Sequence, residues 1–135
     1  MATENDTRGD AGASVDWEVA ATLTCGDDAL LGELIEMFPE ESDKHLEAIR
    51  IGIEQGDGPT LARAAHTLKS SAGLFGASEL AASALEMEIL GQSSSFGEAA
   101  ARLPGLQRMT SRVTAALKRG RPEVKPRKDT DNDEQ

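Results

Sequence analysis

The stretch from Ala62 to Leu80, ARAAHTLKSSAGLFGASEL, lies in the middle of this 135-residue chain. On a helix of about 100° per residue, the apolar residues here fall within about 40° of one line. These apolar residues are Leu61, which directly precedes the quoted stretch, and Ala65, Leu68, Ala72 and Phe75. An apolar stripe of this kind packs against other helices. The pattern therefore predicts a helix of a helical bundle, with this stripe in the core.

His66 lies about 140° from that stripe, on the outer side of the predicted helix. The residues around it are either cations, Arg63 and Lys69, or small, Ser70 and Gly73. Glycine costs about 1 kcal/mol relative to alanine in a helix interior, and serine is only a moderate helix former, so this composition weakens the helix. We interpret the small residues as clearance for another protein, and the cations as partners for an anion on the nucleophilic imidazole.

The segment AHTLKSSAGLFGA resembles the signature of histidine-containing phosphotransfer (HPt) domains, in which A-H-x-L-K-G/S is followed by small residues and a glycine. The matching positions are His66, Leu68, Lys69, Ala72 and Gly76. The sequence departs from the family at Ser70, where glycine is commonest, although serine keeps the site small. The order of predicted helices from Asp27 to about Lys118 also resembles the family's bundle.

The resemblance implies a role for each matched residue. His66 would accept a phosphoryl group on Nε2 from the aspartyl phosphate of a receiver domain, and would pass it to the aspartate of a second receiver. Lys69 would neutralise the phosphoryl charge. Ser70 and Gly73 would let the partner approach closely, and Gly76 would allow a close turn into the next helix.

A glutamine or glutamate on that next helix orients the imidazole by a hydrogen bond in related domains. Counting along the sequence gives Glu88 as the candidate for this position and Glu86 as the alternative. Either glutamate is equally compatible with an ordinary exposed position on the helix. Arg63 is a second candidate for contact with the phosphoryl group. The other histidine, His45, has no small residues around it and is expected to be an ordinary surface residue.

The resemblance also implies the partners, which are response-regulator receiver domains and a sensor or hybrid histidine kinase. Because Mg²⁺ belongs to the receiver in this family, we expect no cofactor or metal on this chain, and no autonomous kinase activity. The sequence contains no P-loop and no glycine-rich nucleotide lid. Two alternatives stay open: a phospho-accepting domain of a chemotaxis-type histidine kinase, or an adaptor that binds receivers without transferring a phosphoryl group.

The apolar residues elsewhere in the chain also follow helical spacings. The chain has no tyrosine and only 3% aromatic residues, a composition that favours an all-α fold over a sheet. We expect an up-and-down antiparallel four-helix bundle with an additional short N-terminal helix. Pro59 suits the first turn of the His66 helix, Pro39 should end or kink its helix, and Pro104 should break the first turns of the last one. The other expected helices span 16–24, 27–38, 77–90 and 98–118, and a further one runs from about 40 to the QGDGP segment at 55–59.

The length favours a single domain with a substantial core. We expect residues 15–118 to form the bundle, with disordered tails over residues 1–14 and 119–135, where polar or charged residues dominate. The C-terminal tail changes from basic to acidic along its length and is interpreted as a solvated segment.

The formal net charge of −10 argues against binding to nucleic acid or to anionic membranes. The only cysteine, Cys25, excludes an intramolecular disulfide. No segment has the apolar core of a signal peptide or the length of a membrane span, about 20 apolar residues. We therefore expect a cytoplasmic protein, and a monomer.

Overall fold

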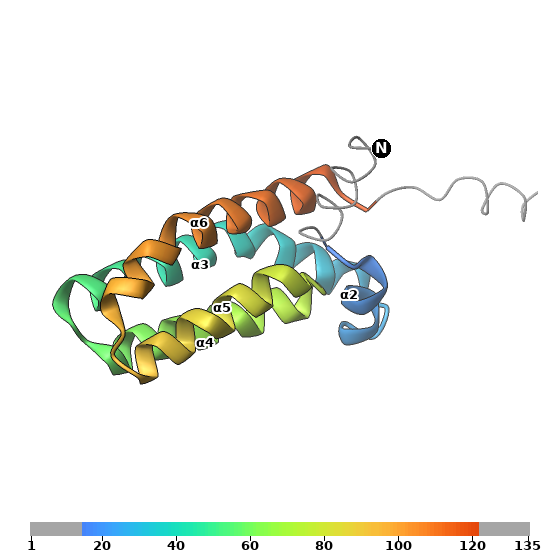
Figure 1. Cartoon of the computed structure of the whole chain (residues 1–135). Coiled ribbons are helices and arrows are strands. Elements are labelled where there is room, and N and C mark those ends of the chain that lie inside the picture. Colours follow the sequence, from blue (N-terminus) through green and yellow to red (C-terminus); the bar gives the residue numbers. More distant parts are fainter. Residues whose placement is uncertain (1–14, 122–135) are drawn as a thin grey trace, which may run out of the picture.

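The computed structural model describes residues 15–121, and all the regular structure within this range is helical (Figure 1). Each of the helices α4 and α6 packs against both α3 and α5, while the short α2 lies against one end of the bundle. The expected all-α bundle with a short N-terminal helix is confirmed. The bounds of the helices are α2 Trp17–Leu23, α3 Asp28–Gln55, α4 Gly58–Leu74, α5 Ser78–Gln92 and α6 Phe96–Arg119.

The prediction of a helix end near Pro39 is wrong, because α3 continues through the proline. Proline removes one backbone hydrogen bond from a helix interior. On either side of it, however, Phe38 is 3% and Ser42 is 1% exposed, so the helix is held in the core at this point. The Ser42 hydroxyl also donates a hydrogen bond of 3.1 Å to the Pro39 carbonyl. Packing therefore outweighs the local effect of proline.

The helix α6 shows the same effect at Pro104, which the sequence pattern had placed at a break. Ala99 and Leu106 are buried on either side of this proline and fix the first turns of α6 in the bundle. The helix α6 begins at Phe96, two residues earlier than expected. The helix α5 ends at Gln92, two residues later than expected.

The predicted apolar stripe of α4 forms the centre of the core. All five of its residues are at most 1% exposed: Leu61, Ala65, Leu68, Ala72 and Phe75. The ring of Phe75 meets that of Phe38 edge to face, with centroids 5.6 Å apart. As expected, Pro59 lies in the first turn of α4. The stripe therefore fixes which side of α4 faces solvent.

Three glycines bring the helix backbones into close contact around the start of α4. A Cβ atom added at Gly91 of α5 would lie 2.7 Å from the backbone nitrogen of Ala62. One added at Gly52 of α3 would lie 2.9 Å from that of Leu61, and one at Gly58 would lie 2.6 Å from the Gly91 carbonyl oxygen. Because no side chain separates the backbones there, the register between α4 and α5 is tightly constrained.

Gly76 allows the turn between α4 and α5, as the sequence comparison implied. Its φ of +64° favours glycine, and an added Cβ would lie 2.5 Å from the Cβ of Asp16. The backbone N–H of Asp16 donates a hydrogen bond of 2.9 Å to the Phe75 carbonyl. Gly76 thus allows the start of α2 to pack against the end of α4.

The described helices begin at Trp17 and the last one ends at Arg119, and the domain bounds expected from the sequence, 15–118, stay a prediction. The predictions for residues 1–14 and for most of 119–135 concern positions outside the described range. Within that range, no helix is long and apolar enough to span a membrane.

Candidate functional site

The helix α4 presents His66 to solvent, opposite the buried stripe. The His66 side chain is 56% exposed, whereas Ala65 and Leu68 on the core side are fully buried. This placement agrees with the periodicity of the sequence. The imidazole is therefore held on a well-packed helix and is accessible to another protein.

One carboxylate on α5 contacts both of the functional side chains predicted on α4. Oε2 of Glu88 lies 3.1 Å from Nδ1 of His66, and Oε1 accepts a hydrogen bond of 3.0 Å from Nζ of Lys69. The Glu88 side chain is only 14% exposed and that of Lys69 is 29% exposed. Glu88 therefore bridges the two residues within the α4–α5 interface.

The ionised state of Glu88 determines which nitrogen of the His66 ring carries the proton in their contact. The hydrogen bond from Lys69, assisted by its positive charge, lowers the pKa of the Glu88 carboxyl, although partial burial opposes this effect. An ionised carboxylate can only accept hydrogen bonds. Nδ1 of His66 must therefore carry the proton in this contact, which leaves the lone pair of Nε2 free as a nucleophile.

Small residues surround the ring on the exposed side of α4. A Cβ added at Gly73 would meet no atom within 4 Å, so this position opens to solvent. The hydroxyl of Ser70 donates a hydrogen bond of 3.2 Å to the His66 carbonyl and thus folds back onto the helix. Arg63 is exposed one turn before His66 and, among the described residues, its guanidinium has no ion pair. The small side chains that the sequence placed around His66 thus leave the exposed side of α4 open in the structure.

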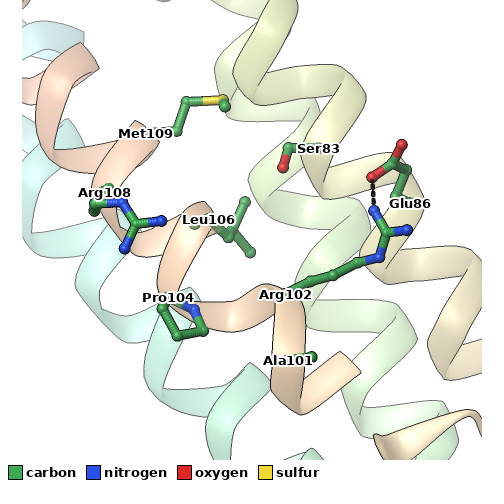
Figure 2. Close-up of a pocket in the computed structure, with 9 residues that line it drawn as sticks. Ser83, Glu86, Ala101, Arg102, Pro104, Leu106, Arg108 and Met109 are labelled. Carbon is green, nitrogen blue, oxygen red and sulfur yellow. Dashed lines mark hydrogen bonds and ion pairs between the residues drawn. The ribbon is translucent and has the colours of Figure 1, made fainter. Parts of the chain in front are cut away.

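Glu86, the alternative to Glu88, lies on a different side of α5. It pairs with Arg102 of α6, at a distance of 2.5 Å. This pair lies at an open pocket between α5 and α6, lined also by Pro104 and Met109 (Figure 2). The pocket has a volume of about 270 Å³. Glu86 is therefore not part of the His66 site.

His45 is not the freely exposed surface residue that was expected. Its side chain on α3 is half-buried, and this burial lowers its pKa. His45 lies four residues before the fully buried Ile49, so the two side chains are only about 40° apart on α3, and His45 is drawn toward the core side. His45 is therefore a poorer candidate than His66 for contact with another protein.

Two features of the site were not predicted from the sequence. The first is the ion pair that already joins Lys69 to Glu88 before any phosphoryl group is present. The second is the presence of exposed apolar side chains beside Glu88: Leu85 is 41% and Ile89 is 51% exposed. Apolar residues on more sides of α5 than the core can cover are a signal in the sequence that could have revealed this surface.

The arrangement can perform nucleophilic chemistry on an anionic group. It provides an accessible ring nitrogen, a carboxylate that fixes the ring and an ammonium group beside it. Within residues 15–121 there is no group of three or more histidine, cysteine or acidic side chains placed to hold a metal ion.

Comparison with known families identifies the fold and its function. The sequence model described as "Hpt domain" matches residues 33–118, which include His66, Lys69 and Glu88. The chain belongs to the Hpt domain family. Hpt domains are phosphotransfer modules, and histidine phosphotransfer in phosphorelays is the function that follows for this Hpt domain.

Two solved structures are similar to this Hpt domain. Histidine-containing phosphotransfer protein B (HptB) from Pseudomonas aeruginosa PAO1 aligns with a TM-score of 0.72 and 24% identity, over 78% of this chain and 91% of that one. The HPT domain of a sensor hybrid histidine kinase from Shewanella aligns with a TM-score of 0.65 and 18% identity, over the same shares. At these identities the likeness shows the fold. No curated protein matches the chain.

Proposed function

We propose that His66 is the phosphorylation site of this Hpt domain. In the proposed reaction, Nε2 attacks the phosphorus of a receiver's aspartyl phosphate, and the ring later passes the group to the aspartate of another receiver. The observation that carries this proposal is the contact between Nδ1 and Glu88, which leaves Nε2 unprotonated while 56% of the side chain is exposed. His66 thus has both the lone pair and the access that the reaction needs.

Lys69 neutralises the phosphoryl group in this proposal. Its ammonium group has three N–H donors, of which Glu88 accepts one. The remaining donors can bond phosphoryl oxygens without breaking the contact with Glu88. Arg63, one turn before His66 on the exposed side, supplies a second positive charge to the approaching partner.

The partner proposed for this site is a receiver domain, loaded by a sensor or hybrid histidine kinase. The absence of side-chain bulk at Gly73 supports close approach over α4, and exposed Leu85 and Ile89 supply apolar contact area on α5. The Mg²⁺ needed for transfer would be held by the receiver, so the Hpt domain has to supply only the nucleophile, its orientation and the neutralising charge.

The proposal is tested by transfer from a phosphorylated receiver. Purified receiver domains are loaded with acetyl phosphate and Mg²⁺, freed of the donor and mixed with the Hpt domain. We expect label to move to the wild-type chain and to a His45→Gln variant, but not to a His66→Gln variant.

The two alternatives predict different results in the same assay. If the protein were instead the acceptor domain of a chemotaxis-type kinase, a kinase domain with ATP would label His66 and loaded receivers would not. A non-transferring adaptor would bind receivers with no label on His66 from either donor. Transfer that persisted in the His66→Gln variant would overturn the assignment of the site.

A further inference from the structure

The carboxylate of Glu88 carries a negative charge that an amide at the same position would lack. Both groups can accept the hydrogen bond from Nδ1 of His66, so orientation of the ring does not by itself require a carboxylate. The charge must therefore be considered separately from the hydrogen bond.

Phosphorylation changes the charge of the imidazole ring. When Nε2 attacks the aspartyl phosphate, the N–P bond forms, the P–O bond breaks and its electron pair stays on the receiver's carboxylate. The ring then carries the phosphoryl group on Nε2, the proton on Nδ1 and a formal positive charge. This cation faces Oε2 of Glu88 at the Nδ1 side, 3.1 Å away in the free protein.

The charged groups around the ring favour different protonation states. On α4, Lys69 and Arg63 are cations and favour loss of the Nδ1 proton, whereas Glu88 of α5 favours its retention. Of the side chains in the described bundle, Glu88 alone bonds the ring. Because Glu88 is only 14% exposed, solvent screens its interaction with the half-exposed ring less than it would if both side chains were fully exposed.

We infer that the negative charge of Glu88 keeps Nδ1 of His66 protonated after Nε2 has been phosphorylated, and so speeds the onward transfer of the phosphoryl group. This inference rests on the proposed function of His66. It makes Glu88 a positioning residue that also tunes the leaving group.

The chemistry of the second transfer explains the effect. The receiver's aspartate oxygen attacks phosphorus, the new O–P bond forms and the Nε2–P bond breaks, with its electron pair returning to Nε2. If Nδ1 has kept its proton, the leaving group is a neutral imidazole. If the proton has been lost, the leaving group is an imidazolate anion, which is expelled far more slowly.

The test uses a matched pair of variants at position 88. The wild type and the Glu88→Gln and Glu88→Ala variants are phosphorylated with phosphoramidate, and the ring is titrated by ³¹P and ¹⁵N NMR. Glutamine keeps a hydrogen-bond acceptor without the charge, and alanine removes both. Glu86→Gln, on the α6 side of α5, is the control for loss of one negative charge from this helix.

The inference predicts that the midpoint for loss of the Nδ1 proton in the phosphorylated ring falls by about 1 to 3 pH units in Glu88→Gln, as for removal of an opposite charge at close range. At a pH between the two midpoints, transfer to a receiver should slow by about tenfold or more for Glu88→Gln, and the Glu86→Gln protein should match the wild type.

The experiment distinguishes failure of the proposed function from failure of the inference about Glu88. If phosphoramidate does not modify His66 in the folded wild type, the proposed function itself is wrong. If His66 is phosphorylated but Glu88→Gln has the wild-type midpoint, Glu88 acts only through its hydrogen bond and the inference is overturned. A lower midpoint in Glu88→Ala with no change in Glu88→Gln would lead to the same conclusion.

Discussion

Nδ1 of His66 lies 3.1 Å from Oε2 of Glu88, a residue 22 positions later in the chain and on a different helix. The contact depends on the register between α4 and α5, which the backbone contact of Gly91 with Ala62 constrains. The position of Glu88 relative to His66 thus depends on a glycine one turn further along α5, where the backbones of the two helices come close together.

Gly91→Ala should therefore disturb both the fold and the site. The added Cβ would lie 2.7 Å from a backbone nitrogen, and overpacking of this kind costs about 1 to 3 kcal/mol. We expect a loss of this size in urea denaturation. Gly32→Ala is the control, because an added Cβ there meets nothing within 4 Å, and it should not destabilise the protein. Equal stability of the two variants would contradict the close packing.

Lys69→Ala should slow phosphotransfer without unfolding the bundle. Lys69 lies beside the core stripe and not within it, and its loss removes a charge-assisted hydrogen bond to the phosphoryl group. Such bonds contribute about 1.5 to 3 kcal/mol, which corresponds to a rate about 10- to 100-fold lower. The rate is measured with a loaded receiver, and circular dichroism checks the fold. Lys44→Ala, on α3, is the control; an equal loss in both variants would show that only net charge matters.

Two substitutions of Gly73 should have different effects, one on stability and the other on receiver docking. It lies in the last turns of α4 with open space around it, so Gly73→Ala should stabilise the protein by about 0.5 to 1 kcal/mol. Gly73→Leu should weaken receiver binding, because the larger side chain projects into the surface cleared around His66. Affinity is measured by titration calorimetry, with Gly97→Leu on α6 as the control. Unchanged affinity for Gly73→Leu would place the docking surface elsewhere.

Much of the fold and the placement of His66 could be predicted from the sequence, because helical periodicity directly reports which side of α4 is buried. The continuation of α3 through Pro39 could not be predicted from the sequence, because it depends on the burial of Phe38 and Ser42 by other helices. Local rules for proline describe an isolated helix, and here tertiary packing outweighed them.

The choice between Glu86 and Glu88 also required the structure. Two residues apart on a helix, they point in directions about 160° apart, and only one can face α4. The sequence does not reveal how α5 is rotated, because its apolar residues lie on several sides. The pairing of Lys69 with Glu88 was missed for the same reason, as it joins residues on two helices.

The ion pair at Glu88 should make stability depend on acidity. The pKa of the Glu88 carboxyl is lowered from its ordinary value of 4.5, chiefly by the hydrogen bond from Lys69. As the pH falls below about 4.5, the unfolded chain therefore takes up this proton before the folded one, and the stabilisation is lost. The free energy of unfolding of the wild type minus that of Glu88→Gln should be largest near neutral pH and decrease in acid. A difference that stays constant from pH 7 to pH 3 would contradict the ion pair.

The central claim is that His66 is the phosphorylated residue, and the most direct test is labelling with phosphoramidate, followed by intact mass and acid lability. The account predicts the gain of one acid-labile phosphoryl group in the wild type and in His45→Gln, and none in His66→Gln. A folded wild-type protein that gains no phosphoryl group, or a His66→Gln variant that still gains one, would contradict it.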